Sequence, residues 1–131
     1  MTAARWAERD LLEHLSTAGI RVYAIWFAMY PGDARSKWPG TLLTDTRVIH
    51  FWDEERITGT RYLSYLPPLV ELRAAGTLQP TADALWDAFF VYPSGATWRD
   101  PVPLPALWGY PIMVTHDELL RSVERLLADV K

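Results

Sequence analysis

Three aspartates lie beside apolar or aromatic segments, where a carboxylate could take part in acid–base chemistry. Asp33 follows one apolar run, Asp53 follows a second, and Asp87 begins a third; a tryptophan directly precedes the last two aspartates. Aromatic neighbours exclude water from a carboxylate and raise its pKa, which suits a general acid or base. His50 could assist such a group, or could join the carboxylates in a site for a hard metal ion.

Each of these side chains also has an ordinary structural interpretation. Asp33 follows Pro31-Gly32 and fits the N-cap of a short helix. Asp53 opens a charged run and could simply end a strand, while His50 alternates with apolar residues and could be a hydrogen-bonded core residue. Asp87 lies between a tryptophan and an apolar run, so a functional role and a buried structural role are equally open.

The chain contains no cysteine, which excludes disulfides, thiolate metal ligands and iron–sulfur clusters. None of its three histidines is spaced from another as metal ligands are. The sequence also lacks a glycine-rich phosphate loop and a Gly-x-Ser-x-Gly motif. We therefore expect no metal ion and no other cofactor.

Charge and hydropathy exclude further classes of partner. The formal net charge is −3 over 131 residues, with acidic and basic side chains mixed along the chain. No basic stripe is present to hold phosphates, so we expect no nucleic-acid partner. No apolar run approaches the roughly 20 residues of a membrane span, and the first residues lack a secretory signal pattern. The sequence therefore predicts a cytoplasmic protein that makes no membrane contact.

To position these residues, the chain must alternate helices and strands. The predicted elements are helix 3–18, strand 21–30, helix 34–43, strand 47–52, helices within 57–75, strand 86–92, strand 96–98 and a final amphipathic helix. A capping box at Thr115-His116-Asp117-Glu118 marks the start of that helix, after a proline-rich irregular connection at 99–114. The order predicts one α/β domain over 1–131, with a central mixed sheet of about four strands flanked by helices and with helices at both ends.

This order resembles that of the thioredoxin-like superfamily, and one segment extends the likeness. In thioredoxins a central strand ends in Trp-Cys-Gly-Pro-Cys-Lys, and a proline follows five residues after the second cysteine. Here the strand ends in Tyr30-Pro31-Gly32-Asp33-Ala34-Arg35, and Pro39 lies five residues after Ala34. The chain thus resembles a divergent member in which Pro31-Gly32-Asp33-Ala34 stands in place of Cys-Gly-Pro-Cys.

Other positions of the superfamily's site are also replaced. Counting back from a hairpin turn at Ser94-Gly95 places Asp87 where thioredoxins carry a cis-proline, and Ile25 stands at their buried acid. Pro31, Ala34 and Ile25 cannot supply a reactive thiolate, a resolving thiol or a proton-transfer group. The resemblance therefore implies the fold without thiol–disulfide oxidoreductase activity.

We favour a ligand- or protein-binding module, in which an aromatic cleft holds a small molecule or a peptide. The cleft is expected to comprise Tyr30, Pro31, Gly32, Asp33, Trp52, Trp86 and Asp87. One alternative is a small acid–base enzyme that uses Asp87 or Asp53, assisted by His50 or Arg35. Another is a structural or partner-bound subunit that makes contact through its proline-rich connection, and a homodimer is also open.

Overall fold

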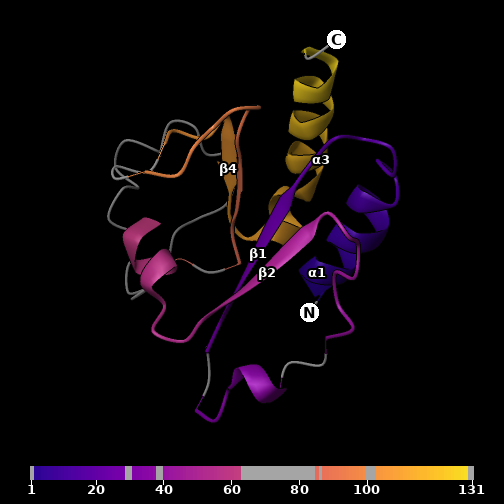
Figure 1. The fold of residues 1–131 in the computed structure, drawn as a ribbon. Coiled ribbons are helices and arrows are strands. Elements are labelled where there is room, and N and C mark those ends of the chain that lie inside the picture. Colours follow the sequence, from indigo (N-terminus) through magenta and orange to yellow (C-terminus); the bar gives the residue numbers. More distant parts are fainter. Residues whose placement is uncertain are drawn as a thin grey trace. The chain divides into compact units, whose positions relative to one another are not determined.

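The computed structural model describes residues 2–28, 31–37, 40–62, 85, 87–99 and 103–129 (Figure 1). They divide into two compact units, Met1–Ile57 and Thr58–Lys131, here called unit 1 and unit 2. Helices and short strands occur in both, which confirms the α/β class. That residues 1–131 form a single domain stays a prediction.

Unit 1 begins with a helix that changes from α-helical to π-helical geometry after its first five residues. The α-helix α1 spans Thr2–Trp6 and continues as the π-helical segment η1, Ala7–Leu12, in which the amide of Glu13 bonds to the carbonyl of Glu8. Leu12 is fully buried and anchors this segment in the core. The helix expected over 3–18 therefore ends six residues early, and turns lead on to the first strand.

The strands of unit 1 form a parallel pair. Strand β1 spans Val22–Phe27 and β2 spans Val48–Asp53, and they are aligned so that Val22 lies opposite Val48 and Phe27 opposite Asp53. Continuous β-branched and aromatic runs favour strands, which is why both were predictable. Because the strands are parallel, their carboxyl ends lie at the same edge of the sheet.

The segment between these strands contains less helix than expected. Of the helix predicted over 34–43, the structure shows the 3₁₀ turn η2, Arg35–Lys37. Gly40 then adopts φ 66° and Leu43 adopts φ 54°, a left-handed conformation that interrupts helix. Leu42 and Leu43 are nevertheless buried, at 5% and 6% exposure, so this loop contributes apolar side chains to the core.

Unit 2 contains an antiparallel pair covered by one long helix. Strand β3, Phe89–Val91, pairs with β4, Leu107–Gly109, and α3, Ile112–Asp129, contacts both. Trp108 and Thr115 are fully buried between these elements. Gly109 permits the close packing, because a Cβ at this position would lie 2.6 Å from the Phe89 ring and 2.7 Å from the Thr115 hydroxyl.

The partner of β3 differs from the prediction. Residues 96–98 do not form the returning strand, although Gly95 adopts φ 85° in a turn. The pairing strand is instead β4, within the connection 99–114 that was expected to be irregular. The physical reason is burial: Trp98 is 51% exposed, whereas Trp108 is fully buried against Phe90. Residues 100–102 of that connection lie outside the described part.

Two further expectations need correction. The four strands form two separate two-stranded sheets among the described residues, where one sheet of about four was expected. Helix α3 begins at Ile112, so Thr115 lies inside its first turn and is not an N-cap. The Thr115 hydroxyl donates to the carbonyl of Pro111 at 2.8 Å, which satisfies this buried group within the helix.

In the described part of the chain, no helix has the length and apolarity needed to cross a bilayer.

Candidate functional site

His50 in β2 is held by two hydrogen bonds that assign its tautomer. The indole N–H of Trp26 donates to Nδ1 of His50 at 3.0 Å, so Nδ1 carries no hydrogen. The other ring nitrogen, Nε2, lies 2.9 Å from the carbonyl of Leu43 and must be the donor there. Both nitrogens of this neutral imidazole therefore serve the packing of unit 1. The structure supports the core interpretation of His50 over the catalytic one.

Asp53, at the end of β2, also makes local structural bonds. Its Oδ1 accepts the amide hydrogen of Ile57 at 2.9 Å, and its backbone carbonyl accepts that of Arg56 at 3.2 Å. Residues 57–62 are helical, so the Asp53 carboxylate satisfies an amide at the start of that segment. This supports a structural role at the strand end.

A turn follows β1 in the chain. Pro31 and Gly32 form a turn with Gly32 at φ 91°, and Asp33 is half-buried ahead of η2. Trp52 in β2 is half-buried as well. The parallel pairing places Phe27 opposite Asp53 at the ends of the two strands. That residues 31–33 and 52–53 line one cleft stays a prediction. Tyr30 and Trp86 of the expected cleft lie outside the described residues.

Asp87 differs from the other predicted carboxylates. It adopts φ 52°, a left-handed conformation that is uncommon for residues other than glycine. Burial raises the pKa of its carboxyl above the ordinary value, and the amide of Ile112 acts in the opposite direction. The Asp87 carbonyl also accepts the hydrogen bond from Ile112 at 3.0 Å. Asp87 belongs to unit 2, and the cis peptide bond among the described residues of this unit joins Tyr110 to Pro111.

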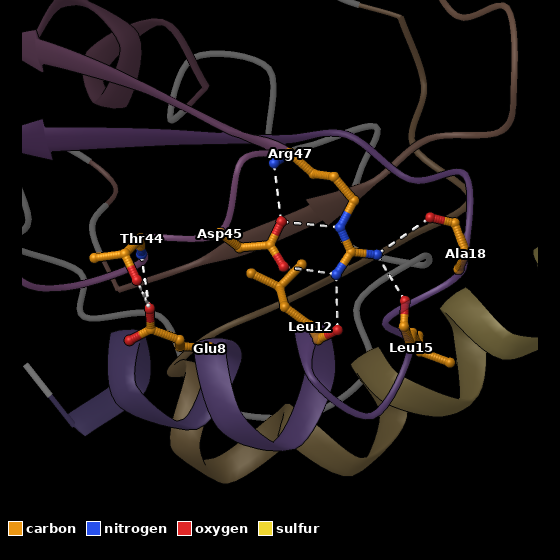
Figure 2. A network of polar contacts seen from close by, with 7 residues as sticks. All are labelled: Glu8, Leu12, Leu15, Ala18, Thr44, Asp45 and Arg47. Atoms are coloured by element: carbon orange, nitrogen blue, oxygen red, sulfur yellow. Dashed lines mark hydrogen bonds and ion pairs between the residues drawn. The ribbon is translucent and has the colours of Figure 1, made fainter.

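The most extensive polar network among the described residues was not predicted from the sequence. The guanidinium of Arg47, which directly precedes β2, lies between the Asp45 carboxylate and the carbonyls of Leu12, Leu15 and Ala18 (Figure 2). Nε and Nη2 donate to Asp45 at 2.9 and 2.7 Å. Nη2 also donates to Leu12 at 2.7 Å, and Nη1 donates to Leu15 and Ala18 at 2.6 and 3.1 Å. These bonds use all five N–H groups of the guanidinium.

This arrangement joins the end of the first helix to the start of β2. Hydrogen bonds from Arg47 hold the pKa of Asp45 down, from 3.8 to about 2, and the carboxylate in turn raises the pKa of Arg47. Positively charged side chains near the C-terminus of a helix often donate to the last carbonyls, which have no hydrogen-bond partner within the helix. The Asp45-x-Arg47 spacing before a strand is a sequence signal for the ion pair. The carbonyl partners cannot be found in this way, because a backbone carbonyl is the same in every residue type.

Glu8 makes a second connection between the helix and the same loop. Its Oε1 accepts the amide hydrogen of Thr44 at 2.7 Å and the Thr44 hydroxyl at 2.6 Å (Figure 2). These bonds lower the pKa of Glu8, the hydroxyl contributing most. Together with the Arg47 network, they give the loop before β2 a fixed position on the helix.

An open depression of about 360 Å³ adjoins these bonds and is lined by Glu8, Glu13, Ser16, Thr44, Asp45, Thr46 and Arg47. Arg47 has no N–H left for a ligand there, because all its donors are used within the protein. Among the described residues, no group of three or more histidines and carboxylates is arranged to hold a metal ion. We conclude that this network is a structural clamp.

A row of aromatic rings in unit 2 also escaped prediction. Tyr62 stacks on Phe90 with ring centroids 3.9 Å apart, and Phe90 stacks on Trp108 at 5.7 Å. Trp98 meets the edge of Tyr62 at 5.3 Å. The hydroxyls of Tyr62 and Tyr92 lie 2.5 Å apart, and burial raises the pKa of both. The row keeps the exposed Trp98 in a defined position.

No family model, curated protein or solved structure matches this chain.

Proposed function

We propose that the chain is a non-redox, thioredoxin-like binding module that holds an extended apolar segment of another polypeptide. The order of a helix, a parallel strand pair, an antiparallel strand pair and a C-terminal helix supports the thioredoxin-like assignment. The absence of cysteine removes thiol chemistry from the module.

One face of the β1–β2 sheet carries the proposal. Tyr23, Ile49 and Phe51 project from this face with exposures of 57%, 38% and 50%. The Tyr23 and Phe51 rings stack with centroids 6.2 Å apart, which makes one continuous apolar surface. Parallel sheets are ordinarily covered on both faces, and exposed apolar patches of this kind mark interaction sites.

The strand edges indicate the form of the occupant. In the described part of the chain, β1 and β2 pair only with each other. An extended peptide can add to such an edge through main-chain hydrogen bonds while its side chains cover the aromatic face. Tyrosine, phenylalanine and isoleucine then supply the apolar contact.

The acid–base alternative has lost most of its support. His50 is hydrogen-bonded through both ring nitrogens, and Asp53 is bonded to the amide of Ile57. The alternative now depends on Asp87, which has a raised pKa. A single carboxyl whose pKa is raised by burial is a weaker basis for an enzyme than the exposed face is for a binding module.

Site-specific photocrosslinking tests the proposal. A benzoylphenylalanine introduced at Phe51 should give a discrete adduct with one identified protein in the native host. The adduct should reform with the purified partner and be lost in Tyr23→Ser. The matched control is the same probe at Val114, which is 65% exposed on α3. Equal labelling from both positions, or an adduct unaffected by Tyr23→Ser, would overturn the proposal; an adduct with a second copy would replace it with a homodimer.

A further inference from the structure

We propose that unit 2 carries a binding site for a small oxyanion, with phosphate as the best match, between α3 and the start of β4. A cavity of about 140 Å³ opens there, apart from the face used in the proposed function. It is lined by Ala106, Leu107, Glu118, Arg121, Ser122 and Arg125.

Helical spacing places the polar members of this lining together. Arg121 and Arg125 are four residues apart on α3, so their side chains neighbour each other on one face. Ser122 lies three residues before Arg125 and therefore borders the same face. Two guanidinium groups present planar sets of donors that match the oxygens of a phosphate.

The donors of these arginines are largely unused. Arg121 makes one contact, from Nη2 to Glu118 at 3.4 Å, with both side chains substantially exposed. The side chain of Arg125 makes no hydrogen bond or ion pair with any residue that the structure describes. The contrast with Arg47, whose five N–H groups are all engaged, shows which arginines could bind an external anion.

Ser122 provides a third donor in the lining of the cavity. The residue is only 6% exposed, yet it lines the cavity. Its hydroxyl forms no hydrogen bond with another residue in the described part of the chain. This hydroxyl can therefore donate its hydrogen to an anion that enters the cavity.

Size and charge fit a single small anion. A volume of 140 Å³ corresponds to the liquid volume of roughly four or five water molecules, which admits one phosphate group. Two arginines and one glutamate give the lining a net positive charge, although the whole chain carries −3. Because phosphate has more charge and more acceptor oxygens than a carboxylate, it makes better use of two guanidinium groups.

An NMR titration at constant ionic strength tests the site. Inorganic phosphate should cause saturable shifts of the Leu107 and Ser122 amide signals. Phosphoserine distinguishes a phosphate ester from the free ion as the source, and acetate should bind more weakly. Arg125→Gln should weaken phosphate binding about tenfold, and Ser122→Ala about threefold. Glu118→Gln should tighten it several-fold, because the competing carboxylate is removed.

The control is Arg9→Gln, which removes an exposed guanidinium from unit 1 and should leave phosphate binding unchanged. Equal weakening by Arg9→Gln and Arg125→Gln would overturn the site and indicate general charge attraction. An unchanged affinity in both Arg125→Gln and Glu118→Gln would also overturn it. Both of these residues are substantially solvent-accessible, so signal dispersion should show that the variants remain folded.

Discussion

The indole of Trp26 donates a hydrogen bond to Nδ1 of His50 across the paired strands β1 and β2, at 3.0 Å. The two rings also stack, with centroids 6.1 Å apart. Since Nδ1 is the acceptor, the remaining ring nitrogen donates to the carbonyl of Leu43. One imidazole thereby joins both strands to the loop that precedes β2.

Replacing His50 should destabilise unit 1. His50→Leu leaves the Trp26 N–H and the Leu43 carbonyl without this partner, so we expect a loss of about 1 to 3 kcal/mol in unfolding free energy. His50→Gln keeps one donor and one acceptor and should restore part of that loss. Urea unfolding followed by tryptophan fluorescence measures both. Equal stability of His50→Leu and the wild-type protein would contradict the structural assignment of this histidine.

Replacing Arg47 with lysine should lower the stability of the folded protein. Lysine keeps the charge but offers three donors on a single nitrogen, so it cannot reproduce the bidentate contact with Asp45 and the three carbonyl contacts. We expect Arg47→Lys to lower the unfolding free energy by about 1 to 3 kcal/mol. Arg9→Lys is the matched control, because Arg9 is exposed and should tolerate the change. If both substitutions have the same effect, the clamp does not contribute as inferred.

The same clamp predicts a loss of stability in acid. The pKa of Asp45 falls from 3.8 to about 2 in the folded protein, so the unfolded chain takes up its proton first as the pH drops. The contribution of Asp45 is therefore complete above about pH 4 and is lost as the pH falls through about 2. Glu8 acts in the same direction. Between pH 2 and 5, the urea midpoint of Asp45→Asn should depend less steeply on pH than that of the wild-type protein. An equal dependence in both would argue against a stabilising role of the Asp45 carboxylate.

The strands of unit 1 and the last helix could be predicted because their signals are local. The apolar runs over 21–30 and 47–52 contain β1 and most of β2, and the predicted final amphipathic helix corresponds to α3. Adjacent residues of suitable type are enough to specify such elements. The parallel pairing of β1 and β2 is also confirmed, and it places the carboxyl ends of both strands at one edge.

The missed features depend on partners distant in the chain. Strand β4 has three residues in a proline-rich stretch, and its position depends on Trp108 packing against Phe90. The carbonyls bound by Arg47 lie 29 to 35 residues away. Backbone acceptors carry no residue identity, so no sequence pattern marks them. Where local propensity is weak, burial and long-range contacts thus determine which residues form a strand.

Gly109 should be sensitive to the addition of one methyl group. A Cβ there would lie 2.6 Å from the Phe89 ring and 2.7 Å from the Thr115 hydroxyl, and both neighbours are buried. We expect Gly109→Ala to cost about 1 to 3 kcal/mol through overpacking. Gly19→Ala is the control, because nothing lies within 4 Å of the added atom. Thermal unfolding should separate the two variants; equal melting temperatures would contradict the packing between β3, β4 and α3.

The charged carboxylate of Asp87 should lower the free energy of unfolding at neutral pH. Burial raises the pKa of its carboxyl above 3.8, so the folded protein holds the proton more tightly than the unfolded chain does. Its contribution is therefore most favourable below the unfolded pKa and is lost as the pH rises through the folded pKa. Asparagine tolerates φ 52° and carries no charge, so Asp87→Asn should raise the urea midpoint at pH 7, with a gain that shrinks toward pH 4. Asp87→Ala removes the charge but strains the left-handed backbone, and should gain less. A lower midpoint for Asp87→Asn at pH 7 would mean that the charged carboxylate stabilises unit 2, and it would remove the case for a desolvated acid at this position.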